Sequence, residues 1–291
     1  MERKREWIWG WLLILPALVF ILLFTHYPAV RTVIESLWST PRGTRPTHFV
    51  GLHNYERLLN DPTFWQVLTN NVVYALGTIP VSVALAIVMA ILVNRPYKGR
   101  ALARMAFFTP TILPLIAVAN IWLFFYLPGF GLIDQVLGLF GIGQTNLLGD
   151  PGTALPAVMV VSVWKEAGFF MIFYLAALQA IPPQLTEAAR IEGAGRWTIF
   201  WRITFPLLMP TTLFVSINAV INAFRLVDHI FILTGGGPDN ASSLLLFYIY
   251  ETSFRYWDTA YGATLTVVLL ALLCLLAIGQ FFLFDRKVHY K

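Results

Sequence analysis

The sequence has very little charge for its length. Only 12% of its 291 residues are Asp, Glu, Lys or Arg, whereas 58% are hydrophobic and the mean hydropathy is +0.70. A soluble domain carries about 25% charged residues, so the composition excludes an ordinary soluble protein and predicts a membrane protein. Spans of about 20 residues with connecting loops account for the length better than two soluble domains do.

Cysteine is almost absent. The one cysteine, Cys274, lies within an apolar run. A single cysteine excludes an intramolecular disulfide and gives no indication of a thiol active site. We expect Cys274 to pack against a neighbouring helix or to face lipid.

Motifs for nucleotide and metal chemistry are missing as well. No lysine follows a glycine, so the phosphate-binding motif G-x-x-x-x-G-K-[ST] is absent. H-E-x-x-H is also absent, and the histidines are spread over separate segments without ligand spacing. The chain is therefore not expected to be an enzyme, to bind a metal or to hold a cofactor of its own.

Six long apolar runs are present instead. They cover residues 9–30, 72–93, 105–126, 157–181, 207–233 and 260–284, and each is long enough to cross the hydrocarbon core as a helix. The first follows a basic start that resembles a signal peptide, but no small-residue cleavage pattern follows and the run is long, which favours a retained helix. The sequence predicts an all-α membrane protein with six transmembrane helices in a single domain over 1–291.

Lysine and arginine predict the orientation of these helices. With the N-terminus inside, thirteen of the twenty basic residues fall on the cytoplasmic side and five on the opposite side. The positive-inside rule then places both termini in the cytoplasm. The charges form no basic stripe interleaved with aromatic residues, so no nucleic-acid partner is expected. The cytoplasmic set is Arg3, Lys4, Arg5, Arg95, Lys98, Arg100, Arg104, Arg190, Arg196, Arg202, Arg286, Lys287 and Lys291, and the opposite set is Arg31, Arg42, Arg45, Arg57 and Arg255.

The segment EAARIEGAGRW at 187–197 is unusually polar and falls in the cytoplasmic loop between the fourth and fifth runs. Two prolines should end the preceding helix, and 185–191 favours a short helix with Thr186 as a possible cap and Glu187 in its first turn. Gly193 and Gly195 should break that helix, and a second helix should run from about residue 196 to Phe205-Pro206. An amphipathic loop lying on lipid headgroups, anchored by tryptophan, fits the same spacing.

These residues resemble a known family. IPPQLTEAARIEGA at 181–194, followed by ITFP at 203–206 and by Pro210, is similar to the EAA loop of permease subunits in binding-protein-dependent ABC importers. FVGLHNY at 49–55, LAALQAIP at 175–182 and LTGGGP at 233–238 resemble the carbohydrate branch, which includes maltose-type and glycerol-3-phosphate permeases. One departure is Glu192, where the family more often has Asp.

The resemblance implies a mechanism and a set of partners. Coupling helices within about 182–206 would insert into a cleft on a separate ATPase subunit, of which there would be two, binding the ATP and magnesium. A second, related six-helix permease and an extracytoplasmic binding protein would complete an importer in the inner membrane of a bacterium or archaeon. The implied coupling residues are Glu187, Ala188, Ala189, Glu192, Gly193 and Ala194.

Charged side chains inside the expected spans are candidates for a solute pathway, because such groups are costly in a bilayer. Arg225 and Asp228 are spaced to pair along one helix face, whereas Lys165 and Glu166 point about 100° apart and need partners elsewhere. Pairing that only holds helices together, or snorkelling to the interface, explains the same residues. The pathway candidates are Asn120, Lys165, Glu166, Asn218, Asn222, Arg225 and Asp228.

The solute itself stays open between two classes. Amide, carboxylate and aromatic groups suit a sugar, whereas lysine and arginine would suit a phosphorylated polyol. The loops at 31–65, 127–155 and 234–258 are too short to capture a ligand, which predicts delivery by a separate binding protein. The GGGP turn at 235–238 fits either a docking element or a rigid bend.

Two other classes of protein are weaker interpretations. A secondary transporter would show repeat halves and an ion-binding carboxylate near the midplane, and no repeat is evident. An intramembrane enzyme would need motifs that are missing. Small residues in the second and third runs are candidates for the face toward the second permease: Gly77, Ala84, Ala86, Ala90, Ala117 and Ala119.

Overall fold

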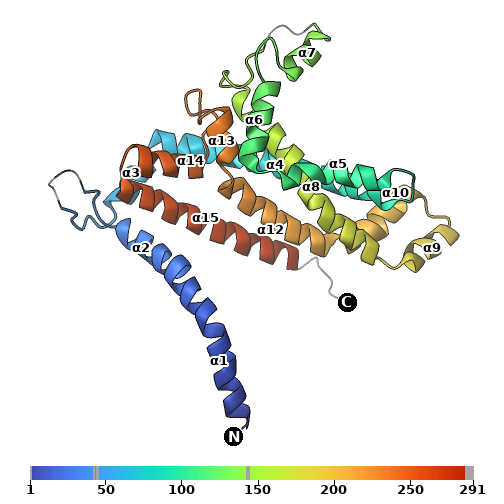
Figure 1. The fold of residues 1–291 in the computed structure, drawn as a ribbon, viewed down its shortest axis with the longest axis horizontal. Helices are drawn as coiled ribbons and strands as arrows, with labels where there is room; N and C mark the ends of the chain where they lie inside the picture. Colours follow the sequence, from blue (N-terminus) through green and yellow to red (C-terminus); the bar gives the residue numbers. More distant parts are fainter. Residues whose placement is uncertain (1, 42, 44–45, 142–144, 286–291) are drawn as a thin grey trace. The chain divides into compact units, whose positions relative to one another are not determined.

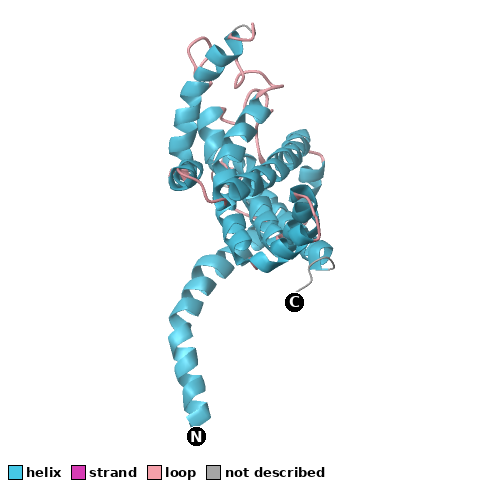
Figure 2. Ribbon diagram, turned by 90° about the vertical axis from the view of Figure 1, so that its right-hand side faces the viewer, coloured by secondary structure: helices cyan, strands magenta, loops and turns pink. Residues whose placement is uncertain are grey.

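The computed structural model describes residues 2–41, 43, 46–141 and 145–285, and within these ranges it consists of helices joined by turns and loops (Figure 1, Figure 2). Within them the nearest approach to a sheet is an isolated antiparallel bridge between Trp38 and Phe49. The predicted all-α class is therefore confirmed. The expectations that rest on Arg42, Arg45, Arg286, Lys287 and Lys291 lie outside the described residues.

The chain divides into two compact units. The first comprises Met1–Asp61 and Ile249–Ala271. In it α1 (Glu2–Ile21) continues through a π-helical segment, Leu22–His26, into α2 (Tyr27–Glu35). The short helix α3 (His53–Leu59) follows, and a second π-helical segment, Glu251–Arg255, precedes α15 (Thr259–Asp285), whose first half belongs to this unit.

The second unit comprises Pro62–Tyr248 and Leu272–Lys291. Its long helices are α4 (Pro62–Asn94), α8 (Ala154–Ala180) and α12 (Met209–Arg225). The shorter helices are α5 (Arg100–Ile112), α6 (Leu115–Phe125), α7 (Leu132–Gly138), α9 (Pro183–Ile191), α10 (Arg196–Ile199), α11 (Phe205–Leu207), α13 (Asp228–Leu233) and α14 (Leu245–Tyr250), the last of which reaches into the first unit.

Five helical segments of the described chain are long and apolar enough to cross a membrane: Trp9–Glu35, Pro62–Asn94, Ala154–Ala180, Met209–Leu233 and Thr259–Gln280. A sixth is present if α5 and α6 count as one span, although they are bent by 104°. The prediction that the third span is a single straight helix over 105–126 is thus wrong. Pro114 disfavours helical geometry at Leu113, whose ψ is 137°. The second span also begins ten residues earlier than expected.

The core of the second unit forms where α4, α8 and α12 meet. Fully buried alanines on α4, Ala86 and Ala90, lie in the same cluster as Phe170 and Tyr174 of α8 and Val215 of α12. Small side chains let membrane helices approach closely and gain dispersion contacts. Ala86 and Ala90 are therefore used inside this chain, which corrects their assignment to a face toward a second permease.

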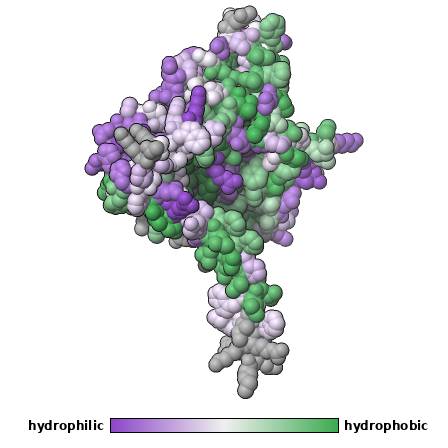
Figure 3. Space-filling view, turned by 60° about the vertical axis from the view of Figure 1, so that its left-hand side comes forward, coloured by the Kyte–Doolittle hydropathy of each residue, from purple (hydrophilic) through white to green (hydrophobic). Residues whose placement is uncertain are grey.

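Large apolar side chains remain on the outside of the helices. Figure 3 shows hydrophobic side chains, in green, over much of the visible surface, and Leu13, Phe24, Leu76, Leu102 and Leu275 are each more than half exposed. A soluble protein rarely exposes this much contiguous apolar area. Such a surface suits a hydrocarbon environment, where every backbone group must be paired within helices.

Candidate coupling loop and solute pathway

Helix α9 carries the first half of the polar loop and begins earlier than the sequence predicts. Pro183 occupies its first turn, where its fixed φ suits a helix start and its missing N–H costs nothing. The hydroxyl of Thr186 donates to the carbonyl of Pro183 at 2.9 Å. Thr186 is therefore inside the helix, and its expected role as the cap is wrong.

The C-terminus of α9 ends in a Schellman motif, in which a left-handed residue lets two N–H groups pair backwards. Gly193 has φ +82° and donates to Arg190 at 3.0 Å, while Ala194 donates to Ala189 at 2.9 Å. No atom lies within 4 Å of a Cβ built on Gly193. Glycine is thus required for its backbone conformation, and the predicted break at this position is confirmed.

The second half of the loop starts at Arg196, as expected, but does not end at Phe205-Pro206. Helix α10 passes into a π-helical segment, Phe200–Thr204, closed by a bond from the N–H of Phe205 to the carbonyl of Phe200. Helix α11 then leads through Leu208 into α12. The widened turn accommodates Pro206, which lacks an N–H, and the loop is nearly continuous with a membrane helix.

The side chains expected to meet an ATPase differ in exposure. Glu187, Ala188, Glu192 and Gly193 are exposed, and no hydrogen bond or ion pair holds the side chain of either glutamate within the described part of the chain. Ala189 is buried, 8% exposed, and faces its own chain. Ala194 is partly buried because the Schellman motif folds it back. The loop therefore presents acidic and small groups outward at the glycine corner, which connects α9 to α10 (Figure 1).

Lys165 and Glu166 find separate partners, as their 100° offset predicts. The ammonium of Lys165 donates to the carbonyls of Pro110 at 2.9 Å and Leu113 at 2.5 Å, at the break between α5 and α6. Glu166 is 8% exposed and interacts with the side chain of Asn222 on α12. The two charged side chains thus contact different elements: Lys165 contacts the break between α5 and α6, and Glu166 contacts α12.

A buried polar cluster lies beside Glu166 that the sequence did not single out as a group. The hydroxyl of Tyr74 donates to Ser162 at 2.6 Å, and both hydroxyls contact Nε2 of His229 at 3.1 and 3.2 Å. Nδ1 of His229 is buried and has no partner among the described residues. Tyrosine and serine are common in apolar helices, so His229, an ionisable residue within an expected span, is the member of the cluster that sequence reasoning could have singled out.

The other pathway candidates are not brought together. Helix α12 ends at Arg225 and α13 begins at Asp228, and Leu226 between them is extended. Among the described residues no ion pair joins these two exposed side chains, so the expected pairing along one helix face is wrong. Asn120 and Asn218 each donate to the carbonyl four residues earlier, at 2.8 Å. In the described part of the chain, Glu166 and Asn222 are the one pair of these candidates whose side chains meet.

Two amide side chains of α4 hold the segment that follows the glycine turn. Gln66 donates to the carbonyl of Asp239 at 2.8 Å, and Asn70 donates to those of Asn240 and Ser243 at 2.8 and 3.0 Å. The turn at 235–238 therefore precedes a segment that is hydrogen-bonded to α4. It borders an open cavity of about 410 Å³, lined by Leu123, Tyr126, Leu127, Pro128, Asn146, Leu148, Gly149, Leu233, Thr234, Gly237 and Pro238.

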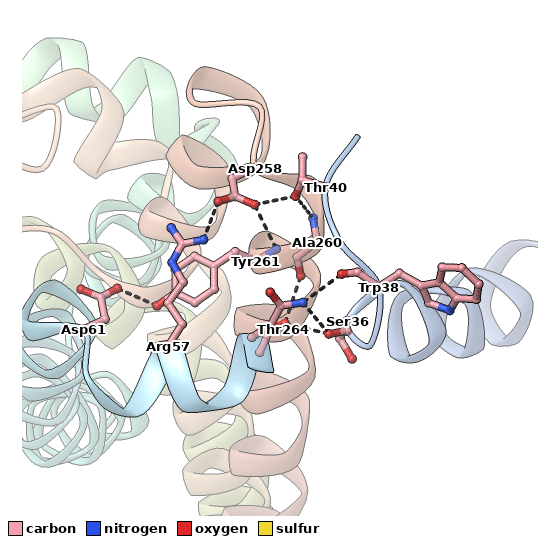
Figure 4. A network of polar contacts seen from close by, with 10 residues as sticks. Ser36, Trp38, Thr40, Arg57, Asp61, Asp258, Ala260, Tyr261 and Thr264 are labelled. Atoms are coloured by element: carbon pink, nitrogen blue, oxygen red, sulfur yellow. Dashed lines mark hydrogen bonds and ion pairs between the residues drawn. The ribbon is translucent and has the colours of Figure 1, made fainter. Parts of the chain in front are cut away.

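In the first unit a polar network joins the segment after α2, helix α3 and the start of α15 (Figure 4). The carboxylate of Asp258 accepts hydrogen bonds from Thr40 at 2.5 Å and from Arg57 at 2.6 Å. Burial alone would raise the pKa of Asp258, but these bonds and the charge of Arg57 outweigh it and hold the pKa below its usual value. Arg57 also stacks on the ring of Tyr261, 4.0 Å from its centroid.

Two characterised permeases are similar to almost the whole chain. The lactose transport system permease protein LacF of Rhizobium radiobacter is 35% identical over 281 residues, covering 94% of this chain and 93% of that protein. The sn-glycerol-3-phosphate transport system permease protein UgpA of Agrobacterium fabrum is 31% identical over 281 residues, covering 96% of each.

A solved structure has the same fold. It is the crystal structure of a bacterial alginate ABC transporter in complex with an alginate pentasaccharide-bound periplasmic protein, and one of its chains matches with a TM-score of 0.87. The sequence identity is 21%, and the match covers 99% of this chain and 97% of that chain. The family model described as "Binding-protein-dependent transport system inner membrane component" matches residues 82–290. On these grounds the chain belongs to the family of inner membrane components of binding-protein-dependent transport systems.

Proposed function

We propose that this chain is the transmembrane permease subunit of an ATP-driven ABC importer that translocates a sugar or sugar-like solute delivered by an extracytoplasmic binding protein. One observation carries the proposal: the family match over residues 82–290 includes the whole loop at 182–206. That loop has the rigid helix, glycine corner and helix geometry that a coupling element needs. The chain is a transport component of the inner membrane.

The topology follows from the charge distribution. Both termini and the 182–206 loop lie in the cytoplasm, and 1–291 acts as one permease domain of six spans, the third of which is broken. The basic residues near the loop, Arg190, Arg196 and Arg202, support this orientation. ATP and magnesium are bound by two partner ATPase subunits, since this chain carries no phosphate-binding motif. A second, related permease completes the membrane part.

Coupling works through contact and rigidity. The outward-facing Glu187 and Ala188 meet the ATPase, where the carboxylate offers an acceptor and the alanine permits close approach. Gly193 fixes the angle between α9 and α10. Because the helical chain continues from α10 into α12 with few interruptions, a displacement of the loop moves the helix that carries Asn218 and Asn222.

The solute pathway is proposed to run past the polar groups of α8 and α12. Glu166 and Asn222 interact with one another and can exchange that contact for solute hydroxyls. Asn120, Asn218, Arg225 and Asp228 are only partly buried or exposed, so their amide and charged groups are accessible from the surface of the helices. Lys165 contributes to the pathway indirectly, through its hydrogen bonds to the backbone carbonyls of Pro110 and Leu113.

A neutral sugar is favoured over a phosphorylated polyol, although relatives of both kinds exist. Lys165, one of the two cations proposed to bind a phosphate, has its ammonium on two carbonyl oxygens. Arg225 is left as the remaining cation of the set, and one arginine is a weak anchor for a dianion compared with the clusters that usually bind phosphate. The solute can be identified experimentally through the binding protein, because that protein can be purified and screened against neutral sugars and polyol phosphates.

The test is an affinity purification of the tagged chain from detergent-solubilised native membranes, with mass spectrometry of the proteins that co-purify. A Walker-motif ATPase and a second six-span protein should accompany the wild-type chain. Glu187→Lys should retain the second permease and lose most of the ATPase. Glu56→Lys, a charge reversal at another exposed glutamate, in α3, is the matched control and should retain both.

The opposite result is equally clear. A chain that purifies alone and moves solute into liposomes without ATP would overturn the importer assignment. The carboxylate of Glu166 would then be the place to look for ion coupling.

A further inference from the structure

The break between α5 and α6 creates an unpaired carbonyl inside the membrane. In an uninterrupted helix the carbonyl of Pro110 would accept from the N–H of residue 114, but residue 114 is proline and has no N–H. Leu113, immediately before it, is extended, with φ −72° and ψ 137°. The last turn of α5 therefore ends with carbonyl oxygens that its own helix cannot satisfy.

Lys165 supplies the missing donors from a different helix. Its Nζ lies 2.9 Å from the carbonyl oxygen of Pro110 and 2.5 Å from that of Leu113, which uses two of its three N–H groups. The C-terminus of a helix carries a partial negative charge, so a cation at this place is favourable in addition to the hydrogen bonds. The neighbouring carboxylate, Glu166, is directed to Asn222, and the carbonyls are the groups that Lys165 contacts.

The same face of α8 is shaped to receive α5. Gly168 is three residues after Lys165 and therefore lies on the same side of the helix. A Cβ built on Gly168 would lie 2.1 Å from the carbonyl oxygen of Phe107 on α5, closer than any real contact. The glycine lets the two backbones touch, and this brings the lysine within reach of the break.

We propose that Lys165 is a positioning residue that acts as a tethered cation: it closes the C-terminal end of α5 at the broken third span and so stabilises the break between the two half-helices. This inference rests on the proposed function and deepens it. Half-helix ends within a membrane otherwise attract ions, and here a covalently attached ammonium occupies that place. Lys165 is accordingly not the ligand for an anionic solute.

The experiment measures the access of water-soluble reagents to the break, and it needs neither solute nor ATP. Thr111, whose buried hydroxyl has no partner among the described residues, is replaced by cysteine in a Cys274→Ser chain. The full chain, with its co-purifying subunits, is labelled with N-ethylmaleimide in lipid nanodiscs. Lys165→Met keeps the length and loses the charge, whereas Lys165→Arg keeps both the charge and the donors.

Lys165→Met should label about tenfold faster than the parent, because removal of a charged donor leaves buried acceptors unpaired and favours local opening. Lys165→Arg should stay within about twofold of the parent. Propylammonium should slow the labelling of Lys165→Ala, and tetramethylammonium, which has no N–H, should not. A role limited to packing would show none of this rescue.

A second variant keeps the test decisive if Lys165→Met does not reach the membrane. Pro114→Ala restores an N–H that can pair with the carbonyl of Pro110, so Lys165→Ala should label several-fold more slowly in that background than in the parent background. Equal labelling in the two backgrounds, or parent-like labelling of Lys165→Met, would overturn the proposal. The importer assignment is decided separately by the co-purification, so failure of one leaves the other standing.

Discussion

The side-chain oxygen of Asn71 accepts a hydrogen bond from the backbone N–H of Leu245 at 2.6 Å, at a position where Asn71 is fully buried. Its amide nitrogen also donates to the carbonyl of Ala223 at 3.3 Å. One side chain of α4 thereby holds both the start of α14 and the last turns of α12. The glycine turn at 235–238 lies between these two segments in the sequence. Asn71 therefore holds the segment before the turn and the segment after it.

Asn71→Leu should lower the free energy of unfolding by about 1–3 kcal/mol, because a buried N–H and a carbonyl lose their partners. Gln66→Leu removes an exposed amide that donates to Asp239 and should cost well under half as much. Denaturant titration of the purified chain in detergent measures both. Equal losses of unfolding free energy for the two variants would show that burial does not determine how much these hydrogen bonds contribute to stability.

Gly193→Val should strain the corner of the coupling loop, since a β-branched residue is disfavoured at φ +82° by about 1–2 kcal/mol. Gly193→Asn is the matched variant, because asparagine tolerates the left-handed region. We expect ATPase co-purification to fall several-fold for valine and to remain near wild type for asparagine. Normal co-purification with valine would mean that the loop angle is not important.

Gly168→Ala should destabilise the packing of α5 on α8, because the added methyl group would meet the carbonyl of Phe107. Overpacking of this kind costs about 1–3 kcal/mol. Gly279→Ala is the control: it is also within a membrane helix, α15, but no atom lies within 4 Å of its added Cβ, so it should be neutral or slightly stabilising. Thermal unfolding in detergent compares them, and a neutral Gly168→Ala would contradict the close approach.

Asp258 should make the stability of the first unit depend on pH. Its pKa in the folded chain is depressed by Thr40 and Arg57, so its contribution is fully present above the unfolded pKa of about 4 and is lost as the pH falls through the folded value. The contribution is modest, because Arg57 is half exposed. Asp258→Asn should lower stability at pH 7 and flatten its decline below pH 4, measured by chemical unfolding across that range. An unchanged pH profile would count against this assignment.

Much of the membrane architecture could be predicted from the sequence. Runs of about 20 apolar residues have few alternatives to a spanning helix, so five spans appear near their predicted positions in the described part of the chain. The glycine break at Gly193 was also predictable, because only the backbone of glycine adopts the left-handed region freely. The residues 187–194 fall on the expected helix and corner for the same local reasons.

Other features differ from the sequence-based expectation or depend on contacts between distant residues. Pairing of Arg225 with Asp228 assumed a continuous helix, and the extended backbone at Leu226 removes it. The start of α9 at Pro183 displaced Thr186 from the cap. The Tyr74, Ser162 and His229 cluster joins three helices, and no local pattern could have assembled it.

The sequence by itself determined that this chain is a membrane helix bundle with a polar loop of defined geometry, because hydropathy, proline and glycine act over a few neighbouring residues. Only the tertiary structure decided which buried polar groups meet. The third span illustrates the difference: Pro114 makes a break in that helix predictable in principle, whereas the donor that satisfies the break, Lys165, lies more than 50 residues away and is selected by how α5 packs against α8.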